Sequence, residues 1–258
     1  MNVMVFDIET VPDIELGKRI YGLNGLSNEN VFLALCALRK TSVGHSFFPH
    51  FLQKIIVISV LFKYDDYVKV WSLGSIQSNE KELLKRFFFG IEKYVPILVS
   101  WNGCRFDLPV IHYRSLLHKV SSRIYWEIGS CRREFRWNNY LNRFHYRHID
   151  LMDILSAYQN VAFTSLDIIS SMLGFPGKIK MSGEKVWDVF NSGNIKDIRN
   201  YCEIDVLNTY CIYLRFELIR GILTESEYEY SMKSLFFYLR KEKNRDHLKD
   251  FLDLMNFK

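Results

Sequence analysis

The sequence predicts an α/β fold, in which helices pack on a β-sheet. Runs of apolar, β-branched and aromatic residues at 3–8, 54–64 and 97–101 are typical of buried strands. Between the last two runs, residues 78–91 carry apolar side chains at helical spacing. A longer helical pattern covers residues 194–222. Strands and helices therefore alternate along the chain, as they do in proteins of this class.

The first predicted strand carries two acids near its end. Asp7 and Glu9 share one face of the strand, because side chains two residues apart point the same way. Two carboxylates this close repel each other, so both stay ionised only with a cation between them. Their oxygens suit a hard ion such as Mg²⁺ or Mn²⁺. The alternative is an exposed strand end with two solvated acids.

The next part of the chain predicts a hairpin. Residues 11–30 are expected to form a polar connection, and the apolar residues 31–38 fit either a helix or a covering flap. Residues 54–64 and 67–73 then predict two paired strands, because a turn separates a buried run from an alternating one.

Two of the predicted helices carry further acids. An Asn-Gly turn follows the strand at 97–101, and Asp107, followed by Leu-Pro, is typical of a helix start. Taken alone, Asp107 is interpreted as the cap of that helix. In the long helix, Tyr201 and Asp205 lie four residues apart and therefore share a face.

Residues 119–147 differ in composition from the rest of the chain. They hold seven basic and two acidic residues, an excess equal to the formal net charge of +5 of the whole chain, and aromatic residues alternate with the basic ones. Cationic side chains suit phosphates, and aromatic faces suit unpaired bases. We predict that Arg132, Arg133 and Arg136 contact nucleic acid. The alternative is a half-buried hairpin with solvated arginines.

Composition narrows the class of protein. A chain of 258 residues can hold one large domain, or one domain with an appendage, and residues 224–258 predict one or two further helices. The five cysteines have no zinc-binding or redox spacing, which predicts reduced thiols. The longest apolar run is too short to span a bilayer, and no signal peptide is expected. We expect a cytoplasmic protein without a membrane segment, of undetermined oligomeric state.

The order of these motifs resembles that in the DEDD superfamily of 3′–5′ exonucleases, in its tyrosine-bearing branch. FDIET at residues 6–10 is similar to the first motif, NGCRFDLP at 102–109 to the second, and YCEID at 201–205 to the third. The longer matches are similar to a standalone bacterial family that resembles the proofreading exonuclease domain of family B DNA polymerases. The resemblance covers about residues 1–220, and three motifs in order are more specific than any one of them.

The resemblance implies an RNase H-like fold, with a five-stranded mixed sheet flanked by helices over residues 1–220. Residues 119–147 would form an insertion beside the cleft, and residues 221–258 a C-terminal helical extension packed on the domain. Two divalent ions, Mg²⁺ or Mn²⁺, would support phosphodiester hydrolysis. The implied catalytic and metal-binding acids are Asp7, Glu9, Asp107 and Asp205.

The resemblance also implies roles for three other residues. Tyr201 would orient the attacking water, and Thr10 and Asn102 would contact the terminal nucleotide. The expected activity is a metal-dependent 3′–5′ exonuclease, with single-stranded DNA as the expected substrate. Two alternatives stay open. One is an RNA-trimming exonuclease, since the choice of DNA or RNA depends on contacts to the 2′-hydroxyl. The other is a catalytically silent nucleic-acid-binding module.

Overall fold

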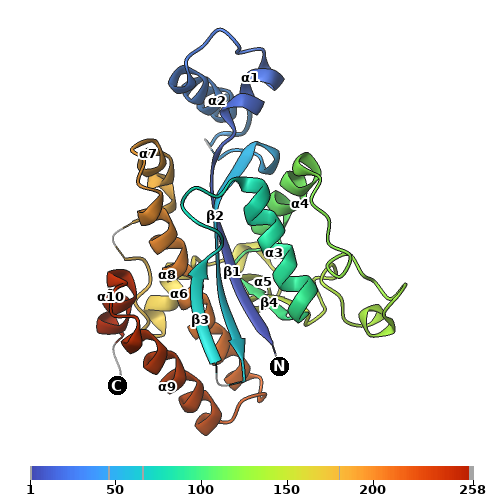
Figure 1. Cartoon of the computed structure of the whole chain (residues 1–258), viewed down its shortest axis with the longest axis vertical. Helices are drawn as coiled ribbons and strands as arrows, with labels where there is room; N and C mark the ends of the chain where they lie inside the picture. The colour runs from blue at the N-terminus through green and yellow to red at the C-terminus, as the bar shows by residue number, and fades with distance from the viewer. Residues whose placement is uncertain (1, 46, 66, 180, 256–258) are drawn as a thin grey trace.

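A five-stranded mixed sheet, in the order β3-β2-β1-β4-β5, organises the chain (Figure 1). The computed structural model describes residues 2–45, 47–65, 67–179 and 181–255. β1 pairs antiparallel with β2 and parallel with β4, and β4 pairs parallel with β5. This topology confirms the predicted α/β class and the mixed RNase H-like sheet. The strands are β1 (Val3–Pro12), β2 (Gln53–Tyr64), β3 (Tyr67–Ser72), β4 (Ile97–Ser100) and β5 (His148–Asp150).

Helices cover both faces of the sheet. α3 and α4 pack on one face, and α8 packs on the other together with α9 and α10 (Figure 1). The helices are α1 (Ile14–Tyr21), α2 (Asn28–Val43), α3 (Glu80–Tyr94), α4 (Asp107–His118), α5 (Leu151–Leu155), α6 (Leu166–Met172), α7 (Val186–Asn191), α8 (Ile195–Ile219), α9 (Glu225–Lys241) and α10 (Asp246–Leu254). None of the helices in the described ranges has the length and apolar character needed to cross a membrane.

Alternation along β1 divides the core into two layers. Val3 and Val5 pack against α8, whereas Met4 and Phe6 pack toward α3, where the rings of Phe6 and Phe87 lie 5.1 Å apart. Side chains alternate along a strand, so the odd-numbered face continues toward α8. This alternation directs Asp7, the next odd-numbered residue after Val5, to the α8 side of the sheet.

The connection predicted at residues 11–30 is partly wrong, because α1 lies within it. Asp13 caps this helix by accepting a hydrogen bond from the backbone N–H of Leu16 at 3.0 Å, and Gly22 ends it in the left-handed conformation. The apolar residues 31–38, for which a helix or a flap was expected, belong to α2. α1 and α2 project together from the end of β1 (Figure 1).

The predicted hairpin of β2 and β3 is confirmed, with Val60 paired to Trp71 in antiparallel register. Asn79 caps α3, since its side chain accepts a hydrogen bond from the backbone N–H of Glu82 at 3.0 Å. The C-terminal segment forms two helices, α9 and α10, which confirms the prediction of one or two further helices there.

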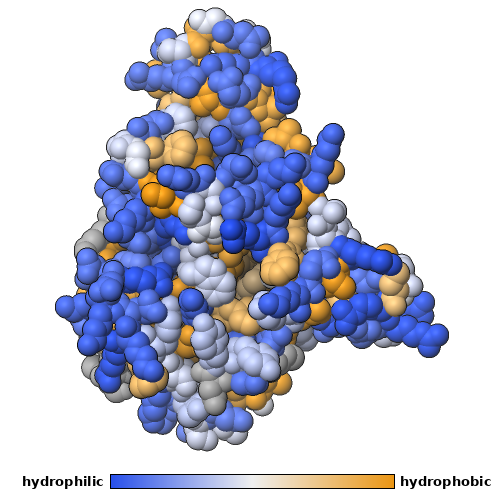
Figure 2. Space-filling model, viewed as in Figure 1, coloured by the Kyte–Doolittle hydropathy of each residue, from blue (hydrophilic) through white to orange (hydrophobic). Residues whose placement is uncertain are grey.

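Residues 119–147, all of them described, contain a 3₁₀ turn (Arg133–Arg136) and no strand, so the hairpin alternative is wrong. Three of the aromatic residues in this segment are buried in the core beside α3 and α4, namely Tyr125, Phe135 and Tyr140. Their spacing therefore reflects packing and not contact with bases. The remainder of the segment projects from the domain, and its tip is mainly hydrophilic (Figure 2).

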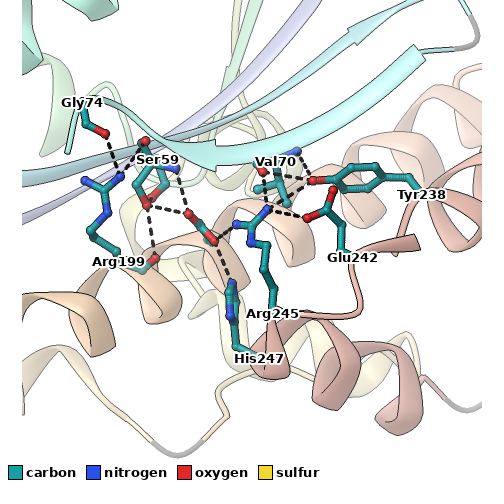
Figure 3. A network of polar contacts seen from close by, with 10 residues as sticks. Ser59, Val70, Gly74, Arg199, Tyr238, Glu242, Arg245 and His247 are labelled. Carbon is teal, nitrogen blue, oxygen red and sulfur yellow. Dashed lines mark hydrogen bonds and ion pairs between the residues drawn. The ribbon is translucent and has the colours of Figure 1, made fainter. Parts of the chain in front are cut away.

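A buried polar network joins α8 to the sheet and to α10 (Figure 3). Glu203 on α8 accepts hydrogen bonds from the backbone N–H and the hydroxyl of Ser72, at 2.8 and 2.7 Å. The same carboxylate pairs with Arg245, and its Oε2 lies 2.7 Å from His247 Nε2. Arg199 donates to backbone carbonyls at the end of β3. The network fixes the rotation of α8 about its own axis, and thereby the direction of the side chains on its other face.

Candidate active site

Four acids from three elements converge on the α8 side of β1. Asp7 and Glu9 lie on β1, and Asp107 is the first residue of α4. The Oδ1 atom of Asp107 accepts a hydrogen bond from the backbone N–H of Ile8 at 3.1 Å, which sets this carboxylate against the strand. Asp205 on α8 completes the group, and its charge acts on both acids of β1.

Burial disfavours the ionisation of all four carboxyl groups, and the neighbouring acids add to this effect at Asp7 and Glu9. Burial, and then the charges of Asp107, Glu9 and Asp205, raise the pKa of Asp7 well above its usual range. Burial, followed by the charges of Asp205 and Asp107, does the same to the pKa of Glu9. Burial also raises the pKa of Asp107 and that of Asp205 to about 7 each. The cluster therefore gains free energy from any cation that binds between its members.

The donor atoms fit a divalent metal ion. Asp205 is 8% exposed, and its Oδ1 atom is buried without a hydrogen-bond partner in the described part of the chain. Asp7 keeps partial exposure, which gives an ion access from solvent. Carboxylate oxygens are the ligands that hard divalent ions prefer. Asp7, Glu9, Asp107 and Asp205 would hold such ions.

Tyr201 lies beside Asp205, as their shared helix face predicts. Its side chain is 6% exposed, and its hydroxyl lowers the pKa of the Asp205 carboxyl against the larger effect of burial. Burial, and then the charges of Asp205, Glu9 and Asp7, raise the pKa of Tyr201 far above its ordinary value. The phenol therefore stays protonated and serves as a neutral hydrogen-bonding group.

Lys178 supplies positive charge to the cluster. It was not predicted from the sequence as a site residue, because its only distinguishing feature there is its place in a glycine-containing loop. Its charge lowers the pKa of Glu9 and of Asp205, against the larger effect of burial. The Asp167 carboxylate accepts a hydrogen bond from the backbone N–H of Lys178 at 2.7 Å. Gly177 adopts φ +65°, and a Cβ atom there would lie 2.5 Å from Asp167 Oδ1, so this tight turn requires glycine.

Asp150 holds the turn that precedes Asp107. Its two carboxylate oxygens accept hydrogen bonds from the backbone N–H groups of Asn102 and Cys104, both at 2.9 Å. Asn102 adopts φ 66°, and its Oδ1 atom is buried without a hydrogen-bond partner among the described residues. In the sequence, Asp150 could be noticed only as an acid at the end of a predicted strand. That it anchors the turn before Asp107 is visible only in the folded structure.

The other predicted contact residues lie in different places. Thr10 follows Glu9 in β1, and its hydroxyl donates a hydrogen bond to Gln53 Oε1 at 2.8 Å. Tyr140 anchors residues 119–147 by donating to the carbonyl of Pro96 at 2.7 Å, before β4, whereas the acid cluster lies beyond the other end of β4. The structure thus does not bring the three arginines in or just before the 3₁₀ turn into the cluster. They are Arg132, which pairs with Glu134 at 2.8 Å, and Arg133 and Arg136, which are exposed.

Two other arginines lie nearer to the second motif. Arg105, within that motif, places its guanidinium 4.3 Å from the ring centre of Phe163. Arg143 pairs with Asp153 at 2.6 Å and lies 5.1 Å from the ring centre of Tyr158. Loop 156–163 is therefore held between the second motif and the end of the basic segment.

Comparisons place the chain among known proteins, and a family model shows its family. A family model described as a predicted 3′–5′ exonuclease related to the exonuclease domain of PolB matches residues 45–255. The comparison with curated proteins found no match. Among solved structures, 42 chains match, including the family B DNA polymerase from the hyperthermophilic archaeon Pyrobaculum calidifontis, with 16% identity and a TM-score of 0.48. The match covers 81% of this chain and 24% of the polymerase, so the chain spans about a quarter of that protein's length.

Proposed function

Since the chain belongs to the family of predicted 3′–5′ exonucleases related to the exonuclease domain of PolB, we propose that it hydrolyses single-stranded DNA from the 3′ end. The observation that carries this proposal is the convergence of four carboxylates on one side of β1, with Tyr201 beside the last of them. Such a cluster is costly to fold without a bound cation, which favours a functional role over a structural one.

We propose that Asp7, Glu9, Asp107 and Asp205 hold two divalent ions, Mg²⁺ or Mn²⁺. The charges of the other three acids all act on Asp7, so Asp7 would be central to holding the ions. Bound ions would supply electrostatic stabilisation to the attacking and leaving oxygens.

Tyr201 would direct the attacking water in line with the leaving 3′-oxygen. A group that stays protonated cannot accept the proton, so its contribution is orientation by one hydrogen bond. Lys178 would offset the charge of the scissile phosphate, in keeping with its effect on Glu9 and Asp205. Asp150 would act through the turn that it holds and not through the substrate.

We propose that Thr10 and Asn102 contact the 3′-terminal nucleotide, because both lie next to the acids of the first two motifs. The Oδ1 atom of Asn102, which has no hydrogen-bond partner in the described part of the chain, supports this role. Arg132, Arg133 and Arg136 would bind phosphates farther along the strand, since they lie outside the acid cluster.

The test uses DNA and RNA oligonucleotides of one sequence, labelled at the 5′ end, with Mg²⁺, Mn²⁺ or EDTA. We expect a ladder that shortens from the 3′ end, needs a divalent ion and forms faster on DNA. Asp7→Ala, checked for folding by circular dichroism, is expected to give no ladder. Faster shortening of RNA would support an RNA-trimming exonuclease, and tight binding without cleavage in either metal would support a silent binding module.

A further inference from the structure

The buried thiol of Cys202 lies against the carboxylates of the candidate active site. Its Sγ atom donates a hydrogen bond to Asp7 Oδ2 at 3.3 Å, and the ligand atoms of Asp7, Glu9 and Cys202 all lie within 4.8 Å of one another. We infer that these three residues form a mixed sulfur–oxygen site for a thiophilic divalent ion such as Zn²⁺ or Cd²⁺. This inference rests on the proposed function, because that ion would compete with the catalytic ions for Asp7 and Glu9.

The spacing of the ligand atoms suits a tetrahedral ion. With a Zn–S distance of about 2.3 Å and a Zn–O distance of about 2.0 Å, a tetrahedral angle places sulfur and oxygen roughly 3.5 Å apart. The observed 3.3 Å between Cys202 Sγ and Asp7 Oδ2 is already close to this separation. Glu9 has a longer side chain, whose rotation can bring its carboxylate to the same ion.

Asp205 provides an independent sign that the site takes a ligand. Its Oδ1 atom is buried and lacks a hydrogen-bond partner in the described ranges, and its charge acts on both Asp7 and Glu9. The grouped ligand atoms are those of Asp7, Glu9 and Cys202, so the fourth position of a tetrahedral ion would be left to water.

Hard ions do not account for the thiol. Mg²⁺ takes oxygen ligands, whereas a thiolate favours zinc-class ions. Binding of such an ion would release the thiol proton to solvent and form a metal–sulfur bond, with no change in oxidation state. A zinc-class ion would therefore occupy the acids of β1 together with Cys202, and would inhibit the nuclease by keeping the catalytic ions from Asp7 and Glu9. The competing explanation is that Cys202 serves the metal-free fold alone. Its thiol donates hydrogen bonds to the backbone carbonyl and the carboxylate of Asp7, and it packs against Val11, Val57 and Ile198.

The experiment titrates the metal-free protein with Cd²⁺ and no nucleic acid, and reads the ultraviolet charge-transfer band of the cadmium–thiolate bond. All proteins carry Cys131→Ser, because the exposed Cys131 would bind cadmium itself. We expect a band that saturates at one equivalent, and Cys202→Ser should remove it and weaken cadmium binding roughly tenfold or more. Cys211→Ser, which removes another buried thiol of α8, should keep the band.

A band of equal size in Cys202→Ser, or the absence of any band, would overturn the inference. If Cys202→Ser fails to fold, X-ray absorption on the zinc-loaded protein with native Cys202 decides instead. It should show one sulfur at about 2.3 Å from zinc, and oxygen ligands alone would refute the site. Because neither measurement uses nucleic acid, a thiolate band without nuclease activity would count against the proposed function alone. Nuclease activity without the band would count against this inference alone.

Discussion

Replacing Asp107 by Asn should stabilise the metal-free protein at alkaline pH. The amide keeps the oxygen that accepts the hydrogen bond from Ile8 and removes the negative charge from the cluster. The pKa of Asp107 in the fold is about 7, above its ordinary 3.8, so the folded state binds this proton more tightly than the unfolded state. The free energy of unfolding therefore falls as pH rises from about 4 to 7 and stays low above pH 7.

The size of the effect follows from the two pKa values. At about 1.4 kcal/mol per pH unit, holding this carboxylate ionised costs the fold on the order of 4 kcal/mol at pH 8. For a chain of this size, Asp107→Asn should then raise the melting temperature by about 10 °C at pH 8 and by very little at pH 4. Saturating Mg²⁺ should stabilise the wild type more than the variant, because the variant binds the ion less tightly.

The assay is thermal unfolding in EDTA, followed by circular dichroism at pH 4 and pH 8. Asp153→Asn serves as the matched control, because Asp153 is equally buried but pairs with Arg143 at 2.6 Å. That substitution leaves a cation without its partner and should lower the melting temperature at pH 8. Should Asp107→Asn melt at or below the wild type at pH 8 in EDTA, the cost inferred for burying the ionised Asp107 carboxylate would be wrong.

Two further predictions concern catalysis and binding. Tyr201→Phe removes one hydroxyl and keeps the ring, so kcat should fall on the order of 10²-fold while metal affinity and oligonucleotide binding barely move. An unchanged kcat at saturating metal and substrate would make Tyr201 a packing residue. Replacing Arg132, Arg133 and Arg136 by Ala should weaken oligonucleotide binding and flatten its salt dependence by up to about 0.7 log unit per lost phosphate contact, with little change in saturated turnover. An unaltered salt slope in a binding titration would show these arginines to be solvated surface.

Features set by local periodicity were predictable from the sequence. The hairpin of β2 and β3 follows from two strand-like runs and a turn. The alternation along β1 directs Asp7 to the α8 side, and the helical repeat places Tyr201 beside Asp205. In each case the geometry of a strand or helix relates residues that are neighbours in the chain. The short helix α1 escaped notice because it lies within an otherwise polar connection and depends on its caps.

Contacts between distant residues needed the tertiary structure. The hydrogen bond from Ile8 to Asp107 joins residues 99 positions apart, and the charge of Lys178 reaches Glu9 through a loop between two helices. The aromatic residues of 119–147 divide between core and surface, although their pattern in the sequence is uniform. A local pattern specifies which way a side chain points from its own element. Which other element it meets is decided by how the sheet and helices pack, and this packing depends on the whole chain.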